Sequence, residues 1–141
     1  MGKVRVSRKE SFNAAHKLYN PAWSKEKNSE VFGLCANENW HGHNFELIVT
    51  IEGEVDAETG FVVDFKKLGV LIDQSVIEKI DHKNLNLDVD FMEGKLASSE
   101  NLIIEIWKIL EPGIVNISKF GRLLRLRLYE TPRNYVDYYG E

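Results

Sequence analysis

The chain has 141 residues, of which 43% are hydrophobic and 28% charged. This composition is typical of one globular domain covering residues 1–141, and it excludes a disordered tail, a collagen-like fibre and a disulfide-stapled miniprotein. A formal net charge of −4 argues against nucleic-acid binding, which usually needs a basic excess. No apolar run reaches membrane-spanning length, and the N-terminus lacks the apolar stretch of a signal peptide. The single cysteine, Cys35, cannot form an internal disulfide. We therefore expect a cytoplasmic protein without a membrane partner.

The first half of the chain contains two predicted strands. Alternation of apolar and polar residues predicts one strand from Val4 to His16 and another over 44–52, where β-branched and aromatic residues are frequent. Residues 19–40 break the alternation with Pro21, Gly33 and scattered charges, which predicts a long loop. A loop of that length in a small domain usually has a function.

The second half changes period. Apolar residues at helical spacing predict a helix over 65–80 with Asp64 as N-cap, and a second helix that begins at Ser98 or Ser99 and ends at Pro112-Gly113. Residues 81–97 are predicted to be a loop, and 123–130 and 135–139 to be strands. The order β-β-α-α-β-β favours the α+β class, with both helices on one face of an antiparallel sheet. The other face and the sheet edges would be exposed, so we expect an oligomer.

The histidines form the most informative local pattern. His41 and His43 flank Gly42, and residues two apart on a strand point to the same side of the sheet. His16 ends the neighbouring predicted strand and could supply a third imidazole. Three imidazoles with an open fourth position are typical of a catalytic zinc site. The alternative is that these are ordinary surface or core histidines.

Other polar residues allow both a functional and a structural interpretation. Cys35 lies in a polar loop near the histidine pair, where a thiolate could act as a base, although most lone cysteines are inert. Asp81 and His82 follow the first predicted helix and are either a polar helix end or an acid–base pair. Glu130 ends a strand and is either solvated or a ligand anchor.

Five segments, in this order and spacing, resemble the 6-pyruvoyl-tetrahydropterin synthase family from about residue 6 to residue 141. They are VSRKESFNAAHKLYN, FGLCANENWHGHN, DHKNLN, SSENL and YETPRNYVDYYGE. The resemblance implies the tunnelling fold, in which three subunits join their sheets into a barrel and two trimers stack into a hexamer. It also implies an active site between subunits.

The resemblance assigns roles by position. It implies that His16, His41 and His43 bind one zinc ion per subunit. It implies that Cys35, Asp81 and His82 are catalytic. For substrate binding it implies Glu130 as the pterin anchor and, at the border of the pterin pocket, Ser98, Ser99 and Glu100.

The implied reaction converts 7,8-dihydroneopterin triphosphate into 6-pyruvoyl-tetrahydropterin, with elimination of triphosphate, in tetrahydrobiopterin biosynthesis. Such an enzyme is a carbon–oxygen lyase acting on phosphates. Magnesium is a second candidate cation, which would bind the triphosphate. Arg8, Lys17 or Lys25 are expected near the phosphates.

Three alternatives stay open. A 6-carboxy-tetrahydropterin synthase of queuosine biosynthesis would use the same substrate, but the five residues between Cys35 and His41 and the YxGE ending favour the biopterin branch. A branch that makes a folate precursor has Glu in place of the cysteine. A zinc- or pterin-binding scaffold without catalysis would need the histidines alone.

Two departures from the family are small: Trp40 replaces a common Gly, and residues 111–121 form a slightly long segment expected to be a hairpin or loop.

Overall fold

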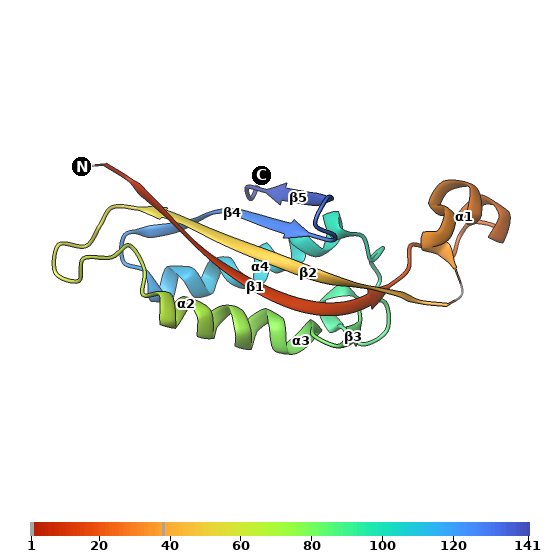
Figure 1. Cartoon of the computed structure of the whole chain (residues 1–141), viewed down its shortest axis with the longest axis horizontal. Coiled ribbons are helices and arrows are strands. Elements are labelled where there is room, and N and C mark those ends of the chain that lie inside the picture. The colour runs from red at the N-terminus through yellow and green to blue at the C-terminus, as the bar shows by residue number, and fades with distance from the viewer. Residues whose placement is uncertain (1, 38) are drawn as a thin grey trace.

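Within residues 2–37 and 39–141, which the computed structural model describes, one sheet has the strand order β3-β1-β2-β4-β5 (Figure 1). The long strands β1 and β2 pair antiparallel without interruption from Val4↔Gly53 to His16↔His41. The strands are β1 (Val4–His16), β2 (His41–Gly53), β3 (Lys83–Asn84), β4 (Gly121–Tyr129) and β5 (Tyr135–Tyr138).

The prediction of a purely antiparallel sheet is wrong at one edge. The two-residue strand β3 pairs parallel with β1, through Ala14↔Lys83 and Ala15↔Asn84, and makes the sheet mixed. Nothing in the alternation of residues 81–97 signals so short a strand. Its pairing with β1 depends on the position at which the preceding helix ends, which is set by tertiary packing rather than by local sequence.

Helices cover one face of the sheet (Figure 1). The helix predicted over 65–80 is present as α2 (Phe65–Ile72), a π-helical turn (Asp73–Ile77) and α3 (Glu78–Ile80). Asp64 caps it as expected, since its side chain accepts hydrogen bonds from the backbone N–H groups of Lys66 and Lys67. Ser98 caps α4 (Ser99–Ile117) by accepting from the N–H of Asn101.

Helix α4 does not stop at Pro112-Gly113, as predicted, but continues one turn further to Ile117. It replaces the loop or hairpin expected over 111–121. Gly113 lets α4 pack closely against α2, because a Cβ atom at this position would lie 2.5 Å from a methyl group of Leu71. The buried side chain of Ile114 stabilises the extra turn.

The core lies between the sheet and these helices. Alternate residues of β2, including Phe45, Leu47 and Ile51, are fully buried against Leu68, Ile106 and other apolar side chains of the helices. The alternation that predicted the strands is thus the alternation of core and solvent. The opposite sheet face is polar, with ion pairs such as Arg5–Glu52 and Arg127–Asp137.

The region 19–40 was expected to be a loop, but its described part contains the helix α1 (Lys25–Phe32) and a 3₁₀ turn (Gly33–Ala36). The side chain of Asn28 is buried, accepts from the N–H of Asn20 and donates to the carbonyl oxygens of Asn20 and Ser24. These bonds attach α1 to the preceding turn without an apolar stripe, which is why periodicity missed the helix. The helix α1 lies beyond the end of β1 and β2 (Figure 1).

None of the helices in the described ranges combines enough residues with enough apolar character to span a membrane.

Candidate active site

The predicted histidine cluster is present where β1 ends and β2 begins. His16 and His41 are directly opposite each other in the antiparallel register, and His43 lies opposite the small side chain of Ala14. One ring nitrogen from each of the three histidines can be chosen so that all three atoms lie within 4.8 Å of one another. This spacing suits three ligands of a single metal ion.

The environment of His16 determines which nitrogen is available. Its Nδ1 lies 2.7 Å from the carbonyl oxygen of Ala97, which can only accept, so Nδ1 carries the proton. The Nε2 lone pair then points into the cluster, where it is buried and has no hydrogen-bond partner. A backbone carbonyl that orients a histidine in this way is a common feature of metal sites.

Burial favours the neutral form of the three imidazoles, which is the form that binds metals. The pKa values of His16, His41 and His43 are all lowered, in each case mainly because burial disfavours the charged ring. The stacked rings of Phe12 and Phe45 form an apolar floor, with the Phe45 centroid 6.0 Å from that of His16. This floor explains the desolvation.

Glu130 lies beside the histidine cluster. Its Oε1 is 3.1 Å from Nε2 of His43, although the contact lacks hydrogen-bond geometry and leaves Nε2 without a hydrogen-bond partner. The other oxygen, Oε2, accepts a 2.6 Å hydrogen bond from the hydroxyl of Ser99, at the start of α4. The carboxylate is therefore fixed at the junction of β2, β4 and α4.

Asp81 and His82 form a separate pair just before the edge strand β3, where both residues contact Asn13 of β1. Asp81 accepts a hydrogen bond from the N–H of Asn13, and this bond is the main reason why the pKa of Asp81 is lowered. The N–H of His82 donates to the carbonyl oxygen of Asn13, and its Nδ1 is 3.1 Å from Asp81 Oδ2.

The backbone at His82 is strained. Its φ of +60° lies in the left-handed region that residues other than glycine rarely adopt. The side chain is 81% exposed, so the strain is not relieved by packing of the ring. Strain of this kind is often found where a side chain must be presented for function.

Cys35 lies in the 3₁₀ turn that follows α1, and it is half-buried. Its carbonyl oxygen accepts a 2.7 Å hydrogen bond from the N–H of Leu18, two residues after His16. This bond attaches the turn to the end of β1, so the cysteine is carried to the same end of the sheet as the histidines.

A family model described as 6-pyruvoyl tetrahydropterin synthase matches residues 5–141. The chain belongs to this family. It is 37% identical to the 6-pyruvoyl tetrahydrobiopterin synthase of Homo sapiens over 139 residues, which is 99% of this chain and 93% of the human protein. It is 34% identical to the dihydroneopterin monophosphate aldolase of Pyrococcus furiosus over 128 residues, covering 91% of this chain and 90% of that protein.

A solved structure of the 6-pyruvoyl tetrahydropterin synthase of Caenorhabditis elegans has the same fold. The TM-score is 0.89 at 35% sequence identity, and the alignment covers 100% of this chain and 98% of that chain. This member of the 6-pyruvoyl tetrahydropterin synthase family therefore has an α+β fold of five strands, within its described residues, and helices on one face.

In this family member, one chain brings together only some of the predicted residues. His16, His41, His43, Glu130 and Ser99 form one connected group. Ser98 serves as the helix cap, Glu100 is exposed in the first turn of α4, and Asp81 and His82 contact Asn13 and each other. Ala97 was missed, because a backbone carbonyl leaves no signal in the side-chain sequence.

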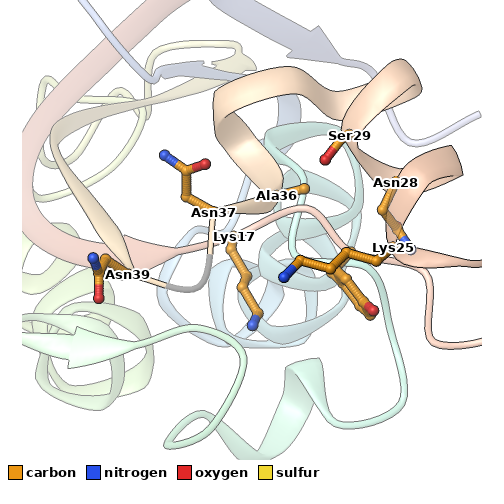
Figure 2. Close-up of a pocket in the computed structure, with 8 residues that line it drawn as sticks. Lys17, Lys25, Asn28, Ser29, Ala36, Asn37 and Asn39 are labelled. Atoms are coloured by element: carbon orange, nitrogen blue, oxygen red, sulfur yellow. The ribbon is translucent and has the colours of Figure 1, made fainter.

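The three residues expected near the phosphates lie in two different places in the fold. Arg8 lies on β1, ion-paired with Glu10 at 2.9 Å and packed over Gly69 of α2. At about 3.3 Å per strand residue, it is roughly 26 Å from His16, which places it outside the histidine cluster of its own chain. Lys17 and Lys25 line a common cavity (Figure 2), and Lys17 directly follows His16 in the sequence.

The residues fit a bound zinc ion. Three neutral imidazoles are the donor set that zinc prefers in catalytic sites. The buried Nε2 atoms of His16 and His43 have no hydrogen-bond partner in the protein, and a metal ion would satisfy both. The metal identity is compatible with zinc but is not fixed by three histidines alone.

Proposed function

We propose that the chain catalyses the zinc-dependent conversion of 7,8-dihydroneopterin triphosphate into 6-pyruvoyl-tetrahydropterin, with elimination of triphosphate, in tetrahydrobiopterin biosynthesis. The observation that carries the proposal is the cluster of three neutral histidines beside the Glu130 carboxylate. Support comes from the family, whose relatives include proteins named 6-pyruvoyl tetrahydrobiopterin synthase.

His16, His41 and His43 would hold the zinc ion. When bound, the ion supplies Lewis acidity, which makes protons on neighbouring carbon atoms of a coordinated hydroxyketone or diol easier to remove. The carbonyl of Ala97 keeps His16 in the required tautomer, and the phenylalanine floor excludes water from beneath the site.

Cys35 would act as the general base and His82 as its proton partner. A thiolate can remove a carbon-bound proton, and an imidazole held by a carboxylate can accept or return it. Asp81 fixes the orientation of His82 through the 3.1 Å contact. Because the reaction rearranges the side chain by internal redox, it needs no external reductant.

Glu130 would anchor the pterin ring. An ionised carboxylate accepts hydrogen bonds from the amino and ring N–H groups of a pterin, and such charge-assisted bonds are strong. The hydroxyl of Ser99 positions Glu130 Oε2 and leaves Oε1 facing the histidines. Ser98 and Glu100 would border the pterin pocket at the start of α4.

A complete site would need more than one chain, which supports the proposal of a hexamer built from two trimers. Asp81 and His82 lie at an exposed sheet edge, whose last strand β3 has only two residues. Barrel closure between subunits would cover such edges. Analytical ultracentrifugation should give a mass about six times that of the 16.2 kDa chain.

Mixing two inactive variants tests the shared site directly. If Cys35 and His82 in one site come from different chains, Cys35→Ala and His82→Ala chains assembled together should recover part of the activity. No recovery from mixed assemblies of the correct mass would exclude this division of the site.

Product analysis by mass spectrometry tests the reaction. The zinc-loaded protein is incubated with 7,8-dihydroneopterin triphosphate without reductant, and the expected products are the 6-pyruvoyl compound and triphosphate. A 6-carboxy product with acetaldehyde would place the chain in the queuosine branch. Cleavage of dihydroneopterin monophosphate would indicate the activity for which the Pyrococcus relative is named. Unchanged substrate would favour the scaffold without catalysis.

A further inference from the structure

A short segment, residues 81–86, is hydrogen-bonded along the edge of β1 near the histidine cluster (Figure 1). The backbone N–H of His82 donates to the carbonyl oxygen of Asn13 at 2.6 Å, and the N–H of Leu85 donates to the carbonyl oxygen of Ala15 at 2.8 Å. The strand β3 lies between these two bonds and pairs parallel with β1. The segment therefore follows β1 to the end that carries the cluster.

A side chain closes each end of this pairing. At one end, the Asp81 carboxylate accepts a 2.9 Å hydrogen bond from the N–H of Asn13. At the other end, the Asn86 amide bonds twice to the backbone of Lys17: its Oδ1 accepts from the N–H at 3.0 Å, and its Nδ2 donates to the carbonyl oxygen at 3.1 Å. A backbone N–H only donates and a carbonyl only accepts, so the two bonds define the orientation of the amide. Asn86 thus extends the parallel pairing with a side chain in place of a backbone.

The turn after β3 presents the Asn86 side chain to β1. Asn84 Oδ1 accepts from the N–H groups of Asn86 and Leu87, at 2.9 and 3.2 Å, which forms an Asx-turn. The N–H of Asn84 donates to the carboxylate of Asp88, and the side chain of Leu85 is buried in the core. Because the turn is already ordered by these contacts, the Asn86 amide loses little conformational entropy when it bonds to Lys17.

The bonds of Asn86 matter because the pairing that they close is short and ends in a strained residue. The strand β3 has two residues, too few to be stable by their own ladder. His82, just before it, has a φ of +60°, a conformation that persists only where the surrounding structure imposes it. The His82 ring is exposed, so the restraint comes from the backbone contacts of the segment. Without Asn86, one end of the segment would be free and the strain at His82 would be released.

The same two bonds act on the residue next to the histidine cluster. Lys17 directly follows His16, and its Nζ is 4.5 Å from the ring centroid of Trp40, which directly precedes β2. The backbone of Lys17 is therefore held by Asn86, while its side chain contacts the chain that enters β2. Asn86 joins the segment that carries His82 to the strand end that carries the cluster.

We propose that Asn86 is a positioning residue of the active site: its bonds to the backbone of Lys17 hold β3 against β1 and keep His82 in its strained conformation. The proposal rests on the proposed function, in which His82 is the proton partner of Cys35, and it adds a residue that acts through His82. Loss of one hydrogen bond corresponds to roughly a tenfold change in the equilibrium between the closed and the open segment.

The first test measures hydrogen–deuterium exchange of the zinc-loaded protein by mass spectrometry, in peptides that contain residues 82–87. Asn86→Asp keeps an oxygen that accepts from the N–H of Lys17 but loses the Nδ2 donor, and Asn86→Leu loses both bonds. Exchange in these peptides should become about tenfold faster in Asn86→Asp and faster still in Asn86→Leu. Unchanged exchange in both variants would overturn the proposal.

Ser118→Ala is the matched control for these variants. The Ser118 hydroxyl also bonds to two backbone groups, the carbonyl oxygen of Val62 and the N–H of Gly121. Gly121 pairs with Gly53, at the end of β2 that is far from the histidines. The control therefore loses a similar pair of bonds at the opposite end of the sheet, and exchange over 82–87 should stay as in the unchanged protein.

The second test asks by steady-state kinetics whether Asn86 acts through His82. Asn86→Asp should lower kcat about tenfold and leave KM unchanged, and Ser118→Ala should change neither. In a His82→Ala background, Asn86→Asp should cause no further fall in kcat, because the group that it positions is already absent. An equal fall in both backgrounds would indicate a merely structural role and would overturn the proposal, as would an unchanged kcat in Asn86→Asp.

The two tests separate this proposal from the proposed function. If the unchanged protein makes no 6-pyruvoyl product but the Asn86 variants exchange faster over 82–87, the restraint on His82 stands and the reaction is wrong. If the product forms and the Asn86 variants exchange and react like the unchanged protein, the role of Asn86 is wrong and the reaction stands. If Asn86→Leu does not fold, Asn86→Asp, which has nearly the same shape as the asparagine, decides alone.

Discussion

His16 donates its Nδ1 proton to the carbonyl oxygen of Ala97 across a distance of 2.7 Å, and this bond joins the end of β1 to the segment before α4. The bond leaves the buried Nε2 atom as an electron-pair donor without a partner. No group in the described part of the chain hydrogen-bonds to this atom, so a bound metal ion would satisfy it.

Metal loading should therefore stabilise the protein as well as activate it. Dialysis against a chelator should abolish product formation and lower the Tm, and added zinc should restore both; at a thousandfold excess over Kd, binding adds about 4 kcal/mol. His16→Ala should prevent stoichiometric zinc binding measured by elemental analysis. His82→Ala is the control and should keep the zinc, since His82 is outside the cluster. An unchanged zinc content in the His16 variant would contradict the assignment.

Replacement of Cys35 should lower the rate of the reaction and leave the folded structure unchanged. Because general bases typically contribute a factor of about 10²–10⁴, Cys35→Ala should lower kcat by at least 100-fold. The half-buried thiol lies outside the apolar core, so zinc content, assembled mass and Tm should stay close to those of the unchanged protein. Steady-state rates that match the unchanged protein would remove Cys35 from the mechanism.

Glu130→Gln should weaken substrate binding while preserving the side-chain shape. The neutral amide loses the charge-assisted bonds to the pterin N–H groups, so KM should rise about tenfold or more. Glu111→Gln, on the exposed side of α4, is a matched control that should have no effect. Titration with unphosphorylated 7,8-dihydroneopterin checks the same point without turnover. An affinity that the Glu130→Gln substitution leaves unchanged would exclude the anchor.

The Arg127–Asp137 pair should make stability depend on pH in acid. Hydrogen bonds from Arg127 lower the pKa of Asp137 in the folded protein, so the contribution of the pair is fully present above the unfolded pKa of about 3.9 and is lost as the pH falls through the lower folded value. Urea unfolding of the unchanged protein and of Asp137→Asn should differ at pH 6, and the difference should shrink below about pH 4. A constant difference from pH 6 to pH 3 would contradict this linkage.

Two glycines should respond differently to alanine. At Gly53, a Cβ atom would lie 2.5 Å from the carbonyl oxygen of Phe120 and 2.8 Å from Cα of Gly121, and backbone atoms of a paired strand cannot move aside. At Gly113 the obstacle is the flexible end of Leu71, and alanine gains about 1 kcal/mol of helix propensity over glycine. Thermal unfolding should show a large loss for Gly53→Ala, about 1–3 kcal/mol, and a smaller one for Gly113→Ala.

Local sequence patterns predicted the long strands, the main helices and their N-caps. Alternation located β1 and β2, helical spacing located α2 and α4, and the caps at Asp64 and Ser98 are as expected. The helix end at Pro112 was wrong because the contact between Gly113 and Leu71 joins residues far apart in sequence. The helix α1 was missed because polar bonds of Asn28, rather than an apolar stripe, hold it in place.

The site was predictable to a similar extent. The spacing of His41 and His43 and the position of His16 at the end of a predicted strand indicated one cluster, and the structure brings the three histidines together. The roles of Cys35, Asp81, His82, Ser98, Glu100 and Glu130 came from resemblance and stay predictions. Arg8 lies far from the histidine cluster of its own chain, beside Glu10 and Gly69, and its expected role near the phosphates stays a prediction. A cytoplasmic location also stays a prediction.

The contact between Lys17 and Trp40 gives the protein an internal optical reporter. Indole emission responds to a charge near the ring, and the ammonium of Lys17 lies 4.5 Å from the Trp40 centroid. A change that draws this ammonium away would alter the emission of one tryptophan out of three. Rearrangement at this end of the sheet could then be followed in real time on the unlabelled protein, with Trp40→Phe as the silent reference.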